Sequence, residues 1–122
     1  MTCKEFYALV GGNYAEAVSR FMSEENVLHF IPKFLSDESF LLLEKGMAEK
    51  DINIAFRAAH TLKGIAQSFG FADLGKSAAV LTEVLRKKTF DGADELFATV
   101  KSDYVKVIDA IKQFLKSQNE EK

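Results

Sequence analysis

Cysteine, proline and tryptophan are scarce in this chain of 122 residues, which contains one cysteine, one proline and no tryptophan. Because Cys3 has no second cysteine to pair with, the chain cannot form an internal disulfide, and this usage is typical of a reducing compartment. A single proline leaves few positions at which a long helix must break. The scarcity of these residues therefore favours a helical protein of a reducing environment.

Long apolar runs and charge imbalance are absent as well. No segment reaches the roughly 20 consecutive apolar residues of a transmembrane helix, and the first residues lack the basic and apolar regions of a signal peptide. The formal net charge is −2, from 16 basic and 18 acidic side chains, so no strong attraction to nucleic acid or to an anionic membrane is expected. These features predict a cytoplasmic protein that binds neither nucleic acid nor membrane.

Helical periodicity is the abundant feature of the sequence. Apolar residues recur at spacings of three and four along most of the chain, and no segment alternates as a half-buried strand does. Residues that favour helix starts precede three early apolar segments: Thr2 with Glu5, Asn13 with Glu16, and Ser23 with Glu24 and Glu25. We expect a helix after each of them.

Later helix boundaries have equally local markers. Pro32 lies inside an apolar stripe and predicts a kink or an early helix end, after which Ser36, with Asp37 and Glu38, is expected to restart the helix. Asp51 is expected to cap the next helix, which should run to about Phe69. Gly70 fits the left-handed position that commonly follows a helix end.

Helices joined by short loops predict an all-α fold, namely an up-and-down antiparallel four-helix bundle with extra short N-terminal helices. The predicted organisation is an N-terminal helical extension over residues 1–22, the bundle over residues 23–117, and a frayed polar tail over residues 118–122. The predicted bundle core comprises Leu28, Ile31, Leu41, Ile54, Leu62, Ile65, Phe69, Leu74, Leu81, Leu85, Val100, Tyr104, Val107 and Ile111.

The helix expected over residues 52–69 carries the chemically informative side chains. On a helical wheel at about 100° per residue, with His60 at zero, seven apolar side chains form one arc between about 120° and 240°. They are Ile54, Ala55, Ala58, Leu62, Ile65, Ala66 and Phe69. His60 lies opposite that arc, so we predict that it faces solvent. A neutral imidazole in such a position is an available nucleophile near pH 7.

Two further residues share this polar face. Gly64 follows His60 by one helical turn, and a glycine inside a helix costs about 1 kcal/mol relative to alanine. One physical use of that glycine is to clear space beside the imidazole. Lys63 can bring a cation toward a phosphoryl group carried on the ring. His60, Lys63 and Gly64 are therefore the candidate site.

This helix resembles the signature of histidine phosphotransfer (HPt) domains of bacterial two-component phosphorelays, through the string His60-Thr61-Leu62-Lys63-Gly64 followed by Gly70. The resemblance is most specific over residues 57–74 and extends in helix order over residues 24–115. It departs at Ile65, where the family usually has serine or alanine. Ile65 falls on the predicted core face, so the departure should alter packing and leave the chemistry unchanged.

The resemblance implies that His60 exchanges a phosphoryl group with the aspartate of a response-regulator receiver domain. It implies partners of the receiver or histidine-kinase class and a phosphocarrier without an ATP-binding domain, and so not an enzyme in the usual sense. No cofactor is expected on this chain, because the Mg²⁺ of the reaction belongs to the receiver. We expect a monomer.

Four residues around the candidate site are predicted to contact a partner: Phe56, Arg57, Gln67 and Ser68. Phe56 falls at about 320° on the wheel, beside His60, and an exposed aromatic ring normally needs a partner to cover it. The opposing interpretation is that Phe56 leans onto the neighbouring helix near Asn53.

The sequence argues against two other functions and leaves a third open. A complete histidine kinase would need a nucleotide-binding domain, and no glycine-rich phosphate-binding loop is present. A metal-binding bundle would need more ligands, because His29 and His60 are the only histidines and no Glu-x-x-His pair occurs. His29 lies in an apolar stretch and is expected to pack. A non-catalytic interaction bundle that keeps the fold stays open as the alternative.

Overall fold

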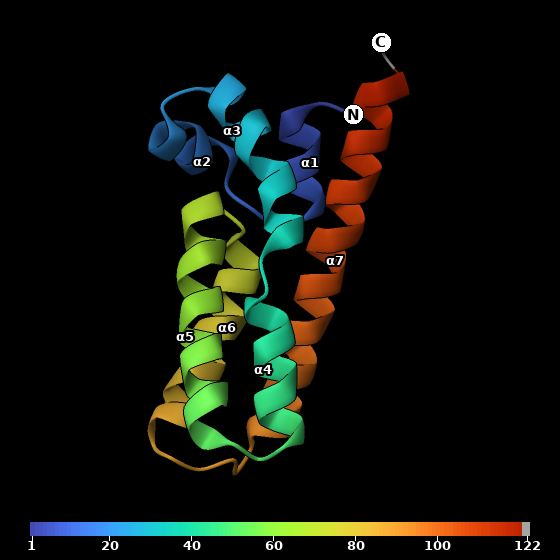
Figure 1. Cartoon of the computed structure of the whole chain (residues 1–122). Coiled ribbons are helices and arrows are strands. Elements are labelled where there is room, and N and C mark those ends of the chain that lie inside the picture. Colours follow the sequence, from blue (N-terminus) through green and yellow to red (C-terminus); the bar gives the residue numbers. More distant parts are fainter. Residues whose placement is uncertain (121–122) are drawn as a thin grey trace.

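The computed structural model describes residues 1–120, and within them the protein forms seven α-helices and one 3-10 helix, η1, with no β-strand (Figure 1). The all-α prediction is confirmed. The elements in chain order are α1 (Cys3–Leu9), α2 (Tyr14–Phe21), α3 (Glu24–Phe30), η1 (Ile31–Ser36), α4 (Ser39–Ala48), α5 (Ile52–Phe69), α6 (Ala72–Arg86) and α7 (Ala93–Glu120).

Side-chain caps begin four of these helices where the sequence predicts them. The Thr2 hydroxyl accepts from the Glu5 amide and the Glu5 carboxylate accepts from the Thr2 amide, which completes a capping box at α1. The other three caps are Asn13 on α2, Ser23 on α3 and Asp51 on α5. Each cap satisfies a backbone donor that the helix itself leaves unpaired.

Pro32 interrupts the third helical segment as predicted, since α3 ends at Phe30 and the chain continues as η1. A helix restarts after Ser36, Asp37 and Glu38 as predicted, but it begins later than Ser36, because α4 starts at Ser39 and Glu38 is the residue before it. The Asp37 carboxylate accepts from both the amide and the hydroxyl of Ser39, at 3.0 and 3.3 Å. Asp37, and not Ser36, therefore provides the polar contact at the start of α4.

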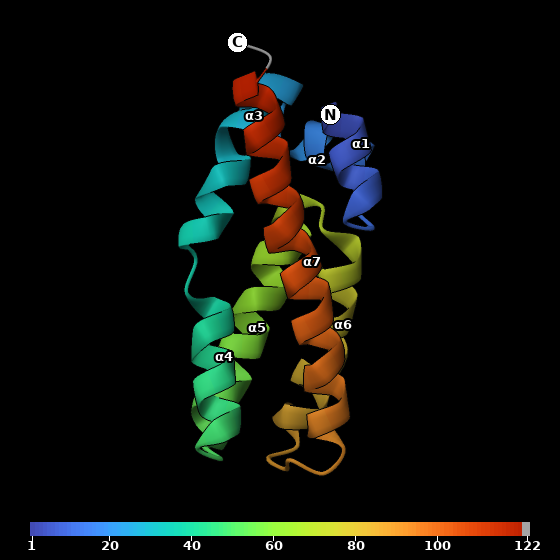
Figure 2. The same cartoon turned by 90° about the vertical axis from the view of Figure 1, so that its right-hand side faces the viewer.

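Helices α4, α5 and α6 run up and down beside the first half of α7, and the second half of α7 extends along η1 and α1 (Figures 1 and 2). Helices α1 and α2 lie at the end of the bundle where α5 ends and α6 begins. Phe40 of α4 reaches α7, where it stacks on Tyr104 with ring centroids 4.1 Å apart. None of the helices within residues 1–120 combines the length and apolar character needed to cross a membrane.

Residues 1–22 share the hydrophobic core of the bundle. Phe6 is fully buried and packs against Phe71 of α6 and Phe114 of α7, with ring centroids 6.0 and 5.4 Å apart. Cys3 is buried beside them, and burial raises the pKa of its thiol to about 11. The N-terminal helices therefore close one end of a single core.

Most of the predicted core is buried or packs against the core, with two exceptions. Leu41 is 59% exposed, because Phe40, Leu43 and Met47 form the buried face of α4 and Leu41 lies about 100° from Phe40 on the helix. Ile54 is half-buried outside the core, in a shallow depression between α4 and α5.

The chain end differs from the prediction as well. Residues 118–120, predicted to be frayed, continue α7, and the Gln118 amide donates to the Met1 carbonyl at 3.0 Å. That contact joins the end of the last helix to the start of the chain. Residues 121 and 122 of the predicted tail lie outside the described residues.

Candidate functional site

Helix α5 carries the candidate site and is held tightly on its inner face. Asp51 caps its start through the Ile54 amide at 3.1 Å, and Gly70 ends it in the left-handed conformation at φ 76°. Its buried residues are small except for one leucine: Ala55, Ala58, Ala59, Leu62 and Ala66. Small side chains let neighbouring helices approach closely, so α5 has little freedom to turn and its outward face is fixed.

The α4–α5 contact shows how close this approach is. A Cβ atom placed on Gly46 of α4 would lie 2.6 Å from the Ala55 backbone nitrogen, which real structures do not allow. Gly46 is therefore required for the two helices to touch. This contact fixes the rotation of α5 about its axis, and with it the direction in which His60 points.

His60 is exposed on the outward face of α5, as predicted. Its imidazole stacks on the ring of Phe56, with centroids 6.0 Å apart and an interplanar angle of 14°. Among the described residues, the His60 side chain forms this ring stack and no hydrogen bond or ion pair. Both ring nitrogens are therefore open to solvent or to a partner.

Lys63 and Gly64 lie on the C-terminal side of His60. Lys63 is half-buried, and its ammonium forms no ion pair within residues 1–119. Gly64 is exposed, and a Cβ atom placed on it would meet no neighbouring atom within 4 Å. The fold itself therefore does not require glycine at this position, and the space beside His60 is open.

Phe56 is less exposed than the sequence analysis predicted. The ring is half-buried, packs against the core, and lies under the Arg86 guanidinium of α6 at 5.1 Å from its centroid. Phe56 and Arg86 also line a depression of about 370 Å³ that includes Asn53. The ring therefore leans onto the neighbouring helix near Asn53, as in the opposing interpretation, and is not exposed as the helical wheel predicted. The wheel could not show this, because Arg86 belongs to α6 and leaves no periodic signal within α5.

The three other predicted contact residues are exposed along α5. Arg57 lies at the edge of a depression of about 220 Å³ that also involves Leu42 of α4. The Gln67 side chain is free of hydrogen bonds within the described residues, whereas its backbone carbonyl accepts from Arg20. The Ser68 hydroxyl donates back to the Gly64 carbonyl at 2.9 Å, so its proton is already engaged.

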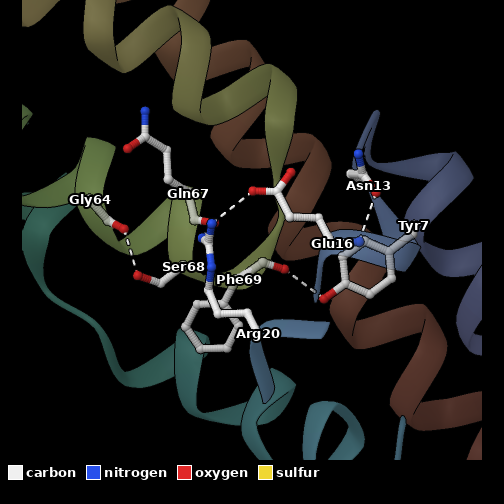
Figure 3. A network of polar contacts seen from close by, with 8 residues as sticks. All are labelled: Tyr7, Asn13, Glu16, Arg20, Gly64, Gln67, Ser68 and Phe69. Carbon is white, nitrogen blue, oxygen red and sulfur yellow. Dashed lines mark hydrogen bonds and ion pairs between the residues drawn. The ribbon is translucent and has the colours of Figure 1, made fainter. Parts of the chain in front are cut away.

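The C-terminal end of α5 is bound by the N-terminal helices through hydrogen bonds that the sequence does not predict (Figure 3). The Tyr7 hydroxyl donates to the Phe69 carbonyl at 2.7 Å, and the backbone N–H of Asn13 donates to the Gly70 carbonyl at 2.9 Å. These carbonyls have no partner inside α5, because they lie at its end. Burial raises the pKa of Tyr7 well above its usual range, so this phenol stays protonated and remains a donor.

We expect Tyr7→Phe to lower the free energy of unfolding by about 1–2 kcal/mol, since it removes one partly buried hydrogen bond and leaves a carbonyl unpaired. Urea denaturation followed by circular dichroism measures this change. Tyr7 contacts the C-terminal end of α5, whereas the ring that stacks on His60, Phe56, lies nearer the other end of the helix. Chemical phosphorylation of His60 should therefore proceed as in the parent. An unchanged free energy of unfolding would show that this bond contributes nothing.

The surface around His60 has a positive character. Helix α5 contains two basic residues, Arg57 and Lys63, and no carboxylate from Ile52 to Phe69. Among the described residues, no group of three or more His, Cys, Asp or Glu side chains is placed to hold a metal ion. The other histidine, His29, is exposed, and its ring lies nearly perpendicular to that of Phe30, so its predicted packing role is wrong.

The site combines an exposed imidazole on a fixed helix, a lysine that forms no ion pair within residues 1–119, and a glycine with open space above it. This arrangement can be compared with known families. The family model for the Hpt domain matches residues 35–116, two-thirds of the chain. The protein belongs to the Hpt domain family. No solved structure gives a significant match to the chain.

Membership places this Hpt domain among the histidine phosphotransfer modules of phosphorelays, which carry phosphoryl groups and interact with response regulators and kinases. The match begins at Leu35, inside η1, and includes all of α4, α5 and α6. Helices α1, α2 and α3 lie outside it. In this Hpt domain they are joined to the matched region through the shared core and the end of α5.

Proposed function

We propose that His60 accepts a phosphoryl group from, or passes it to, the aspartate of a response-regulator receiver domain. The observation that carries this proposal is the exposed imidazole of His60, presented at the middle of α5 with open space over Gly64. Lys63, which forms no ion pair within the described part of the chain, lies with Gly64 on the C-terminal side of His60. The helix that holds all three falls inside the Hpt match.

The exchange needs one bond to form and one to break. A lone pair of an imidazole nitrogen forms the N–P bond while the P–O bond to the receiver aspartate breaks, and the carboxylate leaves with that electron pair. The return transfer reverses both steps. Positioning and charge stabilisation are the main contributions required of a protein in phosphoryl transfer. The Mg²⁺ of the reaction is expected on the receiver.

Lys63 is the group on this chain that would stabilise the transferred charge. Its ammonium is not engaged by a carboxylate of the described residues, so it can turn toward a phosphoryl group on the neighbouring ring. The absence of carboxylates along α5 removes repulsion against that negative charge. Arg57, Gln67 and Ser68 extend the same exposed face and are proposed to contact the receiver.

Transfer from a panel of phosphorylated receiver domains tests the proposal. Each receiver is labelled with a radioactive small phosphodonor, freed of excess donor, and mixed with this protein. We expect label to move to this chain within minutes from at least one receiver. Binding of a receiver without transfer of label would contradict the proposal and would favour the non-catalytic interaction bundle.

A further inference from the structure

Phe56 lies one helical turn before His60, and the two rings are nearly parallel. Side chains in an α-helix lean back toward its N-terminus, so the imidazole leans over the turn that carries Phe56. Parallel, offset rings at this separation attract each other. The phenyl ring therefore occupies the N-terminal side of the imidazole.

Phe56 is itself held from the next helix. The Arg86 guanidinium lies over the ring at 5.1 Å from its centroid, and the Arg86 Nε atom pairs with the Glu83 carboxylate at 3.1 Å. The other edge of Phe56 packs against the core. The ring thus has much less freedom than an exposed phenylalanine on a helix would have, and α6 contributes to where it lies.

The two sides of His60 therefore differ. On the N-terminal side stands the held ring of Phe56, and on the C-terminal side Gly64 presents no side chain at all. An incoming phosphoryl donor would be blocked by the phenyl ring on the N-terminal side of His60 and could approach freely from the C-terminal side. The open side is also the side of Lys63.

We propose that Phe56, held by Arg86, is a positioning residue that keeps the His60 imidazole in one orientation, with its open side toward Lys63 and Gly64. This inference rests on the proposed function of His60. It assigns Phe56 to the reaction itself, whereas the sequence pattern assigned it to partner contact. The two roles predict different behaviour toward a donor that has no protein surface.

The expected size of the effect follows from the rotamers available to an unsupported histidine. A helix leaves two common wells for χ1, and χ2 of an imidazole is roughly two-fold, which gives about four arrangements. If one of them is productive, losing the support lowers the rate about fourfold. Phe56→Leu keeps apolar volume against the core while it removes the ring.

The experiment measures phosphorylation of His60 by phosphoramidate, a small donor that needs no docking surface. We expect Phe56→Leu to lower this rate about fourfold, and to lower the rate with a receiver domain by the same factor. Phe56→Tyr, which keeps the ring, should restore both rates. The matched control is Phe90→Leu, because Phe90 is also half-buried under a cation, Lys50 at 5.2 Å, and does not touch His60.

A second readout reports orientation directly. Three-bond couplings of His60 in the unphosphorylated protein should show one dominant χ1 well in the parent and in Phe56→Tyr, and two wells in Phe56→Leu. A parental phosphoramidate rate and a single χ1 well in Phe56→Leu would overturn the positioning role, and slower receiver transfer alone would then assign the ring to docking. Because the couplings need no phosphorylation, a parent protein that accepts no phosphoryl group contradicts the proposed function while the χ1 result still decides the positioning role.

Discussion

His60→Gln is expected to abolish phosphorylation of this Hpt domain while leaving its fold intact. The linkage in the parent should be a phosphoramidate, which is labile in acid and stable in base, and glutamine offers no nitrogen that can form it. The imidazole is exposed and makes one ring stack within the described residues, so its loss should cost no more than about 1 kcal/mol of stability. Acid and base treatment of the labelled protein, with thermal unfolding of both forms, measures the two effects.

His29→Gln is the matched control for this substitution. His29 is the second histidine of the chain, is exposed like His60, and also contacts a phenylalanine ring, that of Phe30 at 5.2 Å. This variant should accept label at the parental rate. Acid-labile label that remains on His60→Gln, or that disappears from His29→Gln, would refute His60 as the phosphoacceptor.

Helix starts and the orientation of His60 could be predicted because both depend on residues close in sequence. A cap is satisfied within the first turn, so Asn13, Ser23 and Asp51 mark their helices without help from the rest of the fold. The outward position of His60 follows from the apolar arc of its own helix. Helices α4 and α6 pack against that arc of α5, so the fold agrees with the periodicity.

Burial is harder to predict from the sequence where an element is short or uniformly apolar. Val27 and Ile31 face the core, and His29 lies about 200° from Val27 on the helix, so it points outward in spite of its apolar neighbours. Leu41 sits in a run of three leucines, of which only Leu43 is buried. In both places the angle of a residue around the helix, and not the apolar composition of the stretch, determines whether its side chain is buried.

The contacts between distant segments could not be predicted from helix caps or from helical periodicity. Arg86 covers Phe56 from α6, and Tyr7 reaches the end of α5 from the first helix of the chain. In each pair the two residues are far apart in the sequence, and no local pattern around one of them indicates the other. These contacts nevertheless shape the site, since the first holds the ring beside His60 and the second pairs the last carbonyls of its helix.

Gly64→Gln should separate stability from transfer, because the open space over Gly64 serves the partner and not the fold. A Cβ atom at this position meets nothing within 4 Å, so a side chain can be added without a clash inside the protein. Removing a glycine from a helix interior should raise the free energy of unfolding by up to about 1 kcal/mol. The longer side chain would occupy the open side of His60.

Displacing a phosphoryl donor by about 1 Å costs on the order of 100-fold in rate, so transfer from a receiver to Gly64→Gln should fall by about that factor. Gly64→Ala is the matched control, since it gains the same helix propensity with a single methyl group and should lose much less. Urea denaturation and single-turnover transfer, measured on both variants, give the two quantities. If Gly64→Gln transfers as fast as the parent, the open side is not the route by which the phosphoryl group approaches, and Lys63 on that side loses its proposed role with it.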